Sequence, residues 1–442
     1  MTKMMHIGQL MSGTGSHVGG WRMPDAQFGS ENLGLIRHMV DLAEKAKLDF
    51  VFFADGLNTG LDAHAGFMLR FEPLSLLGAL AVTTSHIGLV ATVSTSFSQP
   101  YNLARALSTI DHMSNGRVGW NVVTTSSEDA AANFGSEGLP PSGKRYDMAE
   151  EYVEVAKGLW DSWEDGVLIG DKASGQYVDS GKLHVLHHQG ENYSVRGPLN
   201  ISRAPQGYPV IFQAGASDRG IAFAGATAEV IFTAQQIPEE ALAYGDKVRA
   251  AAVAAGRSPD AIKIMCGVCP IVAESKEEAQ KIVAELGALI NPVSAMRVLS
   301  DRMGYDMNQY PLDEPVPDLP PSGAGTQGHA KQLFSIARRE KMTLRQLRDY
   351  AAASSGHRLV LGSPVEIADD FEAWFKSGAT DGFAIMSPYL PAPFEKFTSQ
   401  VIPILVERGL FRAEYEGVTL RDHLGLARPD HPAVLKKTVA AA

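Results

Sequence analysis

Short apolar runs alternate along the chain with longer segments whose apolar residues recur at helical spacing. Eight of the short runs are expected to be β-strands, because most are bounded by polar or turn residues. Strands that are apolar almost throughout are typical of a parallel sheet whose faces are covered by helices. The candidate strands cover residues 5–11, 50–54, 87–92, 118–123, 210–213, 230–233, 262–272 and 382–386.

The segments between these strands predict the covering helices. Residues 33–48 place Leu35, Met39 and Val40 on one face of a helix, and residues 146–160 repeat the pattern. Eight strands that alternate with helices are the number found in a (β/α)8 barrel. We therefore expect an α/β fold, a (β/α)8 TIM barrel with insertions.

Insertions must account for much of the chain, because it has 442 residues and a minimal barrel needs about 250. We expect a single domain over 1–442. Residues 164–208 lack helical periodicity and are expected to carry a hairpin, and residues 411–442 form a tail with a frayed end. Residues 291–362 interrupt the path to the last strand, so this insertion is expected to fold over the barrel mouth as a lid.

Composition and charge narrow the range of partners. The formal net charge is −11, which argues against nucleic acid and against an anionic membrane surface as binding partners. The N-terminus lacks the basic flank and apolar stretch of a secretory signal, and no apolar run approaches the roughly 20 residues of a membrane span. The only two cysteines cannot form a disulfide framework, so a cytoplasmic location is expected.

Polar residues follow most of the predicted strands. Barrel enzymes place their reacting groups at the carboxyl ends of the strands, and a ring of polar side chains there can form a small-molecule site. Such residues can also simply cap helices and satisfy the backbone of loops, so both interpretations stay open for each position. The residues of this ring are Asp55, Thr92, Asn121, Thr124, Gln213, Gly215, Gln235, Gln236 and Ser387.

The loop after the fifth predicted strand, residues 213–220 (QAGASDRG), has the composition of a phosphate-binding turn. Glycine allows a close backbone approach, and free N–H groups at the start of a helix attract an anion. Ser217 adds a hydroxyl donor. The alternative is an ordinary serine N-cap with glycine in the turn.

Three other signals are discounted as sites. Residues 13–15 resemble the start of a dinucleotide fingerprint, but the third glycine is misplaced and no helix follows. Cys266 and Cys269 lie within one predicted strand, where their side chains face opposite sides. The histidines of residues 184–188 lack a cysteine or carboxylate at metal-ligand spacing, so no metal site is expected.

Several longer motifs carry a family resemblance. Residues 116–124 (GRVGWNVVT) and 130–135 (AAANFG) resemble the signature of the bacterial-luciferase-like flavin monooxygenases. Within them, the chain is similar to the group of nitrilotriacetate monooxygenase component A and the sulfone and long-chain alkane monooxygenases. Further matches are residues 49–55 (DFVFFAD), 71–77 (FEPLSLL), 99–105 (QPYNLAR), 145–151 (RYDMAEE), 195–200 (VRGPLN), 213–217 (QAGAS) and 355–358 (SGHR).

The resemblance implies a two-component FMN-dependent monooxygenase. A separate NADH:FMN oxidoreductase would supply reduced FMN (FMNH2), and reaction with O2 would give a peroxyflavin that oxygenates a small organic substrate, such as an aminopolycarboxylate or an organosulfur compound. A homodimer or higher homo-oligomer is expected by analogy. Two alternatives stay open: a deazaflavin-dependent oxidoreductase on the same barrel, and a non-catalytic flavin-binding protein.

The resemblance also assigns cofactor-binding positions one by one. Two positions near the phosphate differ from many relatives, which carry histidine where this chain has Ser142 and a first loop serine where it has Ala216. Both changes weaken the phosphate contacts without removing them, because the Ala216 backbone N–H can still contribute. The implied FMN residues are Asp55 near the isoalloxazine edge, Thr92 and Asn121 near the ring, and Tyr146, Gly215, Ala216 and Ser217 at the phosphate.

Substrate-side residues are less well defined by the sequence. His17 in the first strand–helix loop and His357 in the SGHR motif are candidate catalytic residues, although lone histidines are often structural. Arg22, Arg70 and Arg358 would suit a carboxylate or sulfonate substrate, or could be ion-paired or surface arginines.

Overall fold

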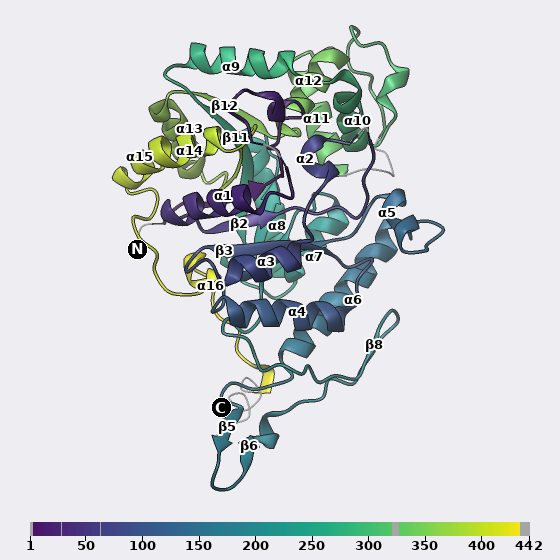
Figure 1. The fold of residues 1–442 in the computed structure, drawn as a ribbon. Coiled ribbons are helices and arrows are strands. Elements are labelled where there is room, and N and C mark those ends of the chain that lie inside the picture. The colour runs from purple at the N-terminus through teal and green to yellow at the C-terminus, as the bar shows by residue number, and fades with distance from the viewer. Residues whose placement is uncertain (1–2, 28, 62, 321–326, 434–442) are drawn as a thin grey trace.

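Eight parallel strands close into a barrel at the centre of the molecule (Figure 1). The computed structural model describes residues 3–27, 29–61, 63–320 and 327–433. Neighbouring strands pair in the order in which they follow along the chain, and pairing of β13 with β1 closes the barrel. The fold class and all eight predicted strands are therefore confirmed. The strands are β1 (His6–Met11), β2 (Phe50–Phe53), β3 (Gly88–Ser94), β4 (Val118–Val123), β9 (Val210–Gln213), β10 (Val230–Thr233), β11 (Lys263–Val272) and β13 (Gly382–Met386).

Amphipathic helices cover the outside of the barrel. In α1 the predicted apolar positions Leu35, Ile36 and Met39 are buried, and Asn32 begins the helix by accepting a 3.0 Å hydrogen bond from the Leu35 N–H. This side-chain bond satisfies one of the backbone donors that a helix start leaves free. The covering helices are α1 (Leu33–Lys45), α3 (Pro73–Ala81), α4 (Pro100–Met113), α6 (Ser142–Trp160), α7 (Asp218–Thr227), α8 (Pro238–Ala254), α9 (Lys276–Ala288) and α13 (Pro364–Lys376).

A ninth strand, β12 (Arg358–Gly362), joins the sheet without belonging to the closed barrel. The ten-residue β11 is longer than its neighbours, and its second half pairs with β12 after β10 has ended. The sequence pattern did not predict this strand. Its residues fall inside the predicted lid insertion, where β11 offers backbone groups that β12 satisfies.

Side chains fill the interior of the barrel. Phe50 and Phe212 meet edge to face with ring centroids 5.0 Å apart, and Leu420 of α16 (Leu420–His423) and the C-cap residue Leu424 belong to the same interior cluster. A filled interior leaves only the rim and loops for a ligand.

The two cysteines of β11 face opposite sides of the sheet, as predicted. Cys266 packs in the cluster between the strands and the helices, whereas Cys269 packs in the barrel interior. Burial raises the pKa of Cys266 to about 11 and that of Cys269 to about 12. Both thiols are therefore inert core residues.

The regions predicted as insertions lie at opposite ends of the molecule (Figure 1). Near the C-terminus lie the hairpin of β5 (Leu168–Asp171) and β6 (Gln176–Val178) and the short pair β7 (His188–Gln189) and β8 (Ser194–Val195). At the other end, α10 (Pro292–Met303), α11 (Gln327–Arg339) and α12 (Leu344–Ser354) share a small apolar core of their own. The division into one domain with insertions at 164–208 and 291–362 stays a prediction.

Residues 411–433 pack against the base of the barrel. Arg421 is fully buried and pairs with Glu229, with the shorter nitrogen–oxygen distance 2.6 Å. Arg428 pairs with Asp165 at 2.7 Å. The end that the sequence predicts to fray, residues 436–442, lies outside the described residues.

No single helix among the described residues has both the length and the apolar character needed to cross a membrane. Only α9 and α10 taken together pass such a test, and a bend of 100° separates them.

The buried carboxylate of Asp49 connects residues that are far apart in the sequence, in β1 and in the C-terminal tail. Asp49 accepts a 2.7 Å hydrogen bond from the Ile7 N–H, lies 3.1 Å from His6 Nδ1 and pairs with Arg412. Burial alone would raise the pKa of Asp49, but Arg412 and His6 outweigh it and the pKa is lowered. We expect Asp49→Asn to lower the free energy of unfolding by about 3–5 kcal/mol, because it leaves the partly buried Arg412 without its counter-ion.

Urea unfolding at pH 7 measures this effect. Glu414→Gln is the matched control, since it breaks the exposed Lys47–Glu414 pair and should change stability by less than about 1 kcal/mol. Because the folded-state pKa of Asp49 is depressed, its contribution is present above the ordinary value of 3.8 and is lost as the pH falls below it. An unchanged urea midpoint in Asp49→Asn would contradict the assignment.

Candidate active site

A polar cavity of about 440 Å³ opens at the carboxyl ends of β2, β3, β9 and β10. A wider groove of about 1080 Å³ adjoins it, and Asp55 and Arg302 line both spaces. Six of the seven predicted FMN residues line the cavity. They are Asp55, Thr92, Tyr146, Gly215, Ala216 and Ser217.

Tyr146, Gly215 and Ser217 converge on the first turn of α7. A Cβ atom added at Gly220 would lie 2.9 Å from the Tyr146 hydroxyl oxygen, 3.1 Å from Ser217 Oγ and 3.1 Å from Gly215 Cα. Two elements far apart in sequence, α6 and α7, therefore bring their polar groups to one point. We call the surface formed by Tyr146, Gly215, Ser217 and Gly220 the α7 cradle.

Ser217 is the N-cap of α7, since its hydroxyl oxygen accepts a 3.1 Å hydrogen bond from the Gly220 N–H. The capping interpretation of this serine is confirmed, and its O–H can still donate toward the cavity. The Gly215 N–H is already used by Gln213 Oε1, at 2.7 Å. Within the described part of the chain, the N–H groups of Ala216 and Ser217 have no acceptor, which leaves two backbone donors for a ligand.

Arg145 lies beside the α7 cradle, and the sequence pattern did not assign it a role. Its Nη1 donates to the Pro140 carbonyl at 2.8 Å, whereas its Nε is buried and has no partner among the described residues. Burial lowers the pKa of Arg145, but a guanidinium remains charged. A cation therefore lines the same cavity as the loop with the free N–H groups, and its position directly before Tyr146 is the sequence signal that could have indicated it.

Asp55, Thr92 and Asn121 form the other side of the site. The Asn121 amide Nδ2 donates a 3.0 Å hydrogen bond to Thr92 Oγ1, so Asn121 stands behind Thr92 rather than in the cavity wall. Its Oδ1 is buried and has no partner within the described ranges. Burial raises the pKa of Asp55, although Arg70 lies 3.9 Å away.

The two candidate catalytic histidines do not line the cavity or the adjoining groove. Both are buried, and His17 Nδ1 accepts a 3.0 Å hydrogen bond from the Gly19 N–H. Burial, with a contribution from His64, lowers the pKa of His17 to about 4; burial and Arg302 lower the pKa of His357 to about 3. Both rings are neutral at pH 7, and their catalytic role stays a prediction.

Two of the three arginines considered for an anionic substrate are engaged elsewhere. Arg358 binds both carboxylate oxygens of Asp370, at 2.7 and 2.8 Å, and stacks on Trp374. Arg22 donates to the Leu289 carbonyl at 3.0 Å. Of the three, Arg70 alone lies at the groove, beside Asp55.

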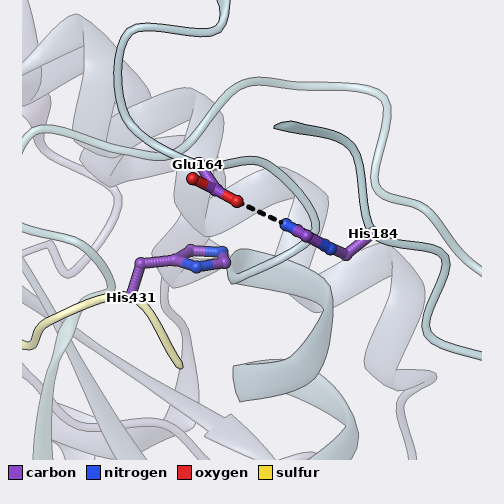
Figure 2. A group of neighbouring side chains, drawn as sticks. All are labelled: Glu164, His184 and His431. Atoms are coloured by element: carbon purple, nitrogen blue, oxygen red, sulfur yellow. Dashed lines mark hydrogen bonds and ion pairs between the residues drawn. The ribbon is translucent and has the colours of Figure 1, made fainter. Parts of the chain in front are cut away.

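A second group of titratable side chains, shown in Figure 2, lines neither the cavity nor the adjoining groove. Glu164 joins His184 at 2.9 Å, an approach that the sequence spacing did not indicate, and His431 stands close by. However, His431 Nε2 donates to the Asp161 carbonyl at 2.9 Å and its Nδ1 accepts from the Ala433 N–H at 3.1 Å. Both ring nitrogens of His431 are thus engaged by backbone, and a bound metal would have to break one of these bonds.

A polar cavity at the carboxyl rim of an eight-stranded parallel barrel is the site expected of a (β/α)8 enzyme. Residues 11–381 match the model of the luciferase-like monooxygenase family, and the chain belongs to that family. It is a flavin-dependent monooxygenase, in agreement with the resemblance seen in the sequence.

Relatives match the chain over nearly its whole length. It is 47% identical to the N-acetyl-S-(2-succino)cysteine monooxygenase of Bacillus subtilis, covering 97% of this chain and 98% of that protein. It is 43% identical to nitrilotriacetate monooxygenase component A of Aminobacter aminovorans, with 97% of each chain covered. A crystal structure of riboflavin lyase with modified FMN and riboflavin superposes with a TM-score of 0.87 at 33% identity, covering 98% of this chain and 99% of that one.

Proposed function

We propose that the protein is the oxygenase component of a two-component monooxygenase. It would receive FMNH2 from a separate NADH:FMN oxidoreductase and use O2 to oxygenate a small organic substrate in the cytoplasm. The observation that carries the proposal is the α7 cradle, where the hydroxyl oxygens of Tyr146 and Ser217 approach one point at Gly220. The cavity around it is also lined by Arg145 and by Ala216 and Ser217, whose backbone N–H groups are free within the described residues. Such a concentration of donors fits a phosphate dianion.

Six of the seven FMN residues implied by the resemblance line the cavity, which supports the FMN assignment. Tyr146, Ser217 and Arg145 would hold the phosphate, while Asp55 and Thr92 would face the ring system. When bound, reduced FMN supplies the electrons that activate O2. Hydroxyl and N–H groups would donate to the phosphate, whereas Ser142 and Ala216 provide weaker contacts than the residues of many relatives. Weaker phosphate binding suits a flavin that must arrive and leave in each turnover.

Besides binding the flavin, the chain must exclude water from this site. Arg302 of α10 and Gln332 of α11 belong to the cavity wall, so helices of the 291–362 segment cover the mouth from one side. A covered site protects a reactive intermediate from water. The lid role of this segment, like the homodimer or higher homo-oligomer, is part of the proposal.

Names of relatives support a separate reductase and suggest substrates to try. One relative is named as a component, and both subunits of a pristinamycin IIA synthase match the chain, so related enzymes are built from more than one protein. Substrates named for relatives are N-acetyl-S-(2-succino)cysteine, nitrilotriacetate, dibenzothiophene sulfone and dimethyl sulfide. The first two carry carboxylates and the last two do not.

The test combines the protein with an NADH:FMN oxidoreductase, NADH, FMN and O2, and follows consumption of each of the four compounds. We expect no turnover by the protein alone and turnover of at least one compound in the complete mixture. If FMNH2 neither binds nor changes O2 consumption, the proposal is wrong. Preferential binding of a reduced deazaflavin would favour the deazaflavin alternative, and tightly held oxidised FMN without turnover would favour a flavin-binding protein.

A further inference from the structure

Five arginines line the cavity or the adjoining groove, and they differ in what they contact. Arg70 lies 3.9 Å from Asp55, Arg297 pairs with Asp301 at 3.0 Å and Arg348 pairs with Asp349 at 2.6 Å. Arg145 donates to a carbonyl and stands at the α7 cradle. Within residues 3–27, 29–61, 63–320 and 327–433, Arg302 has neither a hydrogen bond nor an ion pair.

Within the described residues, no charged group bonds directly to Arg302. It lies in the last turn of α10 and is partly buried. Burial lowers the pKa of Arg302, and the charge of neighbouring Asp301 acts in the opposite direction, although the ion pair of Asp301 is with Arg297. The positive charge of Arg302 also contributes to the lowered pKa values of His64 and His357, whose rings burial already keeps neutral. A partly buried guanidinium without a directly bonded counter-ion is unfavourable, and an anionic ligand would relieve that cost.

The position of Arg302 assigns this anion to the substrate rather than to the flavin phosphate. The cradle for the phosphate is built from α6 and α7, whereas Arg302 comes from α10 and lies where the cavity meets the groove. A ligand lying in the groove would therefore reach Arg302 at the entrance to the flavin cavity. The planar guanidinium can bind both oxygens of a carboxylate.

We propose that Arg302 binds a carboxylate of the substrate, so that the enzyme acts on small carboxylated molecules and discriminates against uncharged ones. This inference rests on the proposed function for the reaction itself, but the binding step can be measured separately. The same side chain belongs to the covering segment, so a bound carboxylate would also connect α10 to the occupied site.

The test measures binding of N-acetyl-S-(2-succino)cysteine and nitrilotriacetate to the FMN-loaded protein by titration calorimetry. Arg302→Gln is expected to weaken binding of at least one of them by about 10- to 100-fold, the effect of losing a charge-assisted bidentate contact. Arg302→Lys should be intermediate, because a lysine keeps the charge without the planar fork. FMN affinity, measured by quenching of flavin fluorescence, should stay within about twofold of wild type in both variants.

Arg338→Gln is the matched control, because Arg338 lies on α11 of the same segment but is exposed and pairs with exposed Asp318. It should bind both probes as the wild type does, and thermal unfolding of all variants checks their folding. The inference is overturned if the wild type binds neither carboxylated probe, if Arg302→Gln binds them unchanged, or if Arg302→Gln loses FMN affinity to the same extent. Failure of the wild type to bind FMNH2 would instead contradict the proposed function, and the carboxylate titration, repeated on the flavin-free protein, would still test the role of Arg302.

Discussion

Tyr146→Phe combined with Ser217→Ala is expected to weaken binding of reduced FMN by about 100-fold or more. Each substitution removes one hydroxyl from the α7 cradle, where the two oxygens approach the same point above Gly220. A hydrogen bond to a charged group contributes about 1.5–3 kcal/mol, and two of them correspond to two or more decades in affinity. Anaerobic titration of FMNH2, followed by flavin absorbance, measures the change.

The control must separate phosphate binding from helix capping, because Ser217→Ala also removes the N-cap of α7. Ser275 caps α9 in the same way, accepting a hydrogen bond from the Glu278 N–H at 3.3 Å, and does not line the cavity. Ser275→Ala should therefore cost a similar stability, about 1 kcal/mol, without changing flavin affinity. Wild-type affinity in the double variant would show that the flavin phosphate binds elsewhere.

The barrel could be predicted from the sequence because its strands carry their own signal. A strand buried on both faces must be apolar throughout, and β2 (Phe50–Phe53) is buried at all four positions. The β12 strand was missed for a different reason. It lies beyond the closed barrel and depends on the extra length of β11, which a local pattern cannot reveal.

The cavity wall was predictable only where residues follow strands or belong to a recognisable motif. Tyr146 and Ser217 come from such motifs, and the structure brings them together at Gly220. Arg302 and Glu164 could not be predicted, since each acquires its role from contacts between segments far apart in the chain. His17 and His357 are the opposite case: the sequence suggested them from a strand–helix loop and from the SGHR motif, but their rings lie in the protein interior.

Acidification from pH 7 to pH 4 is expected to remove most of the folding stability, through histidines that are buried in the neutral form. Burial lowers the pKa of His17 and His64 to about 4 and that of His357 to about 3. Each pKa unit corresponds to about 1.4 kcal/mol. At pH 4 these histidines are more fully protonated in the unfolded chain than in the folded protein, so each one lowers the free energy of unfolding by about 3 kcal/mol. Three such costs rival the whole stability of a typical domain, about 5–15 kcal/mol.

The sign follows from proton uptake on unfolding. A histidine with a depressed folded-state pKa binds protons more readily when unfolded, so its stabilising contribution is lost as the pH falls through the ordinary value of 6.5. Asp111 acts in the other direction, because burial raises its pKa to about 6 and stability is gained as it protonates. Burial also raises the pKa of Asp55 and Asp161, whereas it lowers the pKa of a fourth histidine, His423, to about 4. The four histidines carry the larger shifts, so the net expectation remains a loss of stability between pH 6.5 and pH 4.

Urea midpoints measured from pH 7.5 to pH 4 test this expectation. His64→Gln should flatten the decline, because its ring, packed near Arg302, no longer takes up a proton on unfolding. His38→Gln is the control: His38 is exposed and pairs with Glu395 on the surface, so its replacement should leave the slope unchanged. A urea midpoint that stays constant down to pH 4 would contradict this prediction. It would mean that the buried rings take up protons in the folded protein as readily as in the unfolded chain.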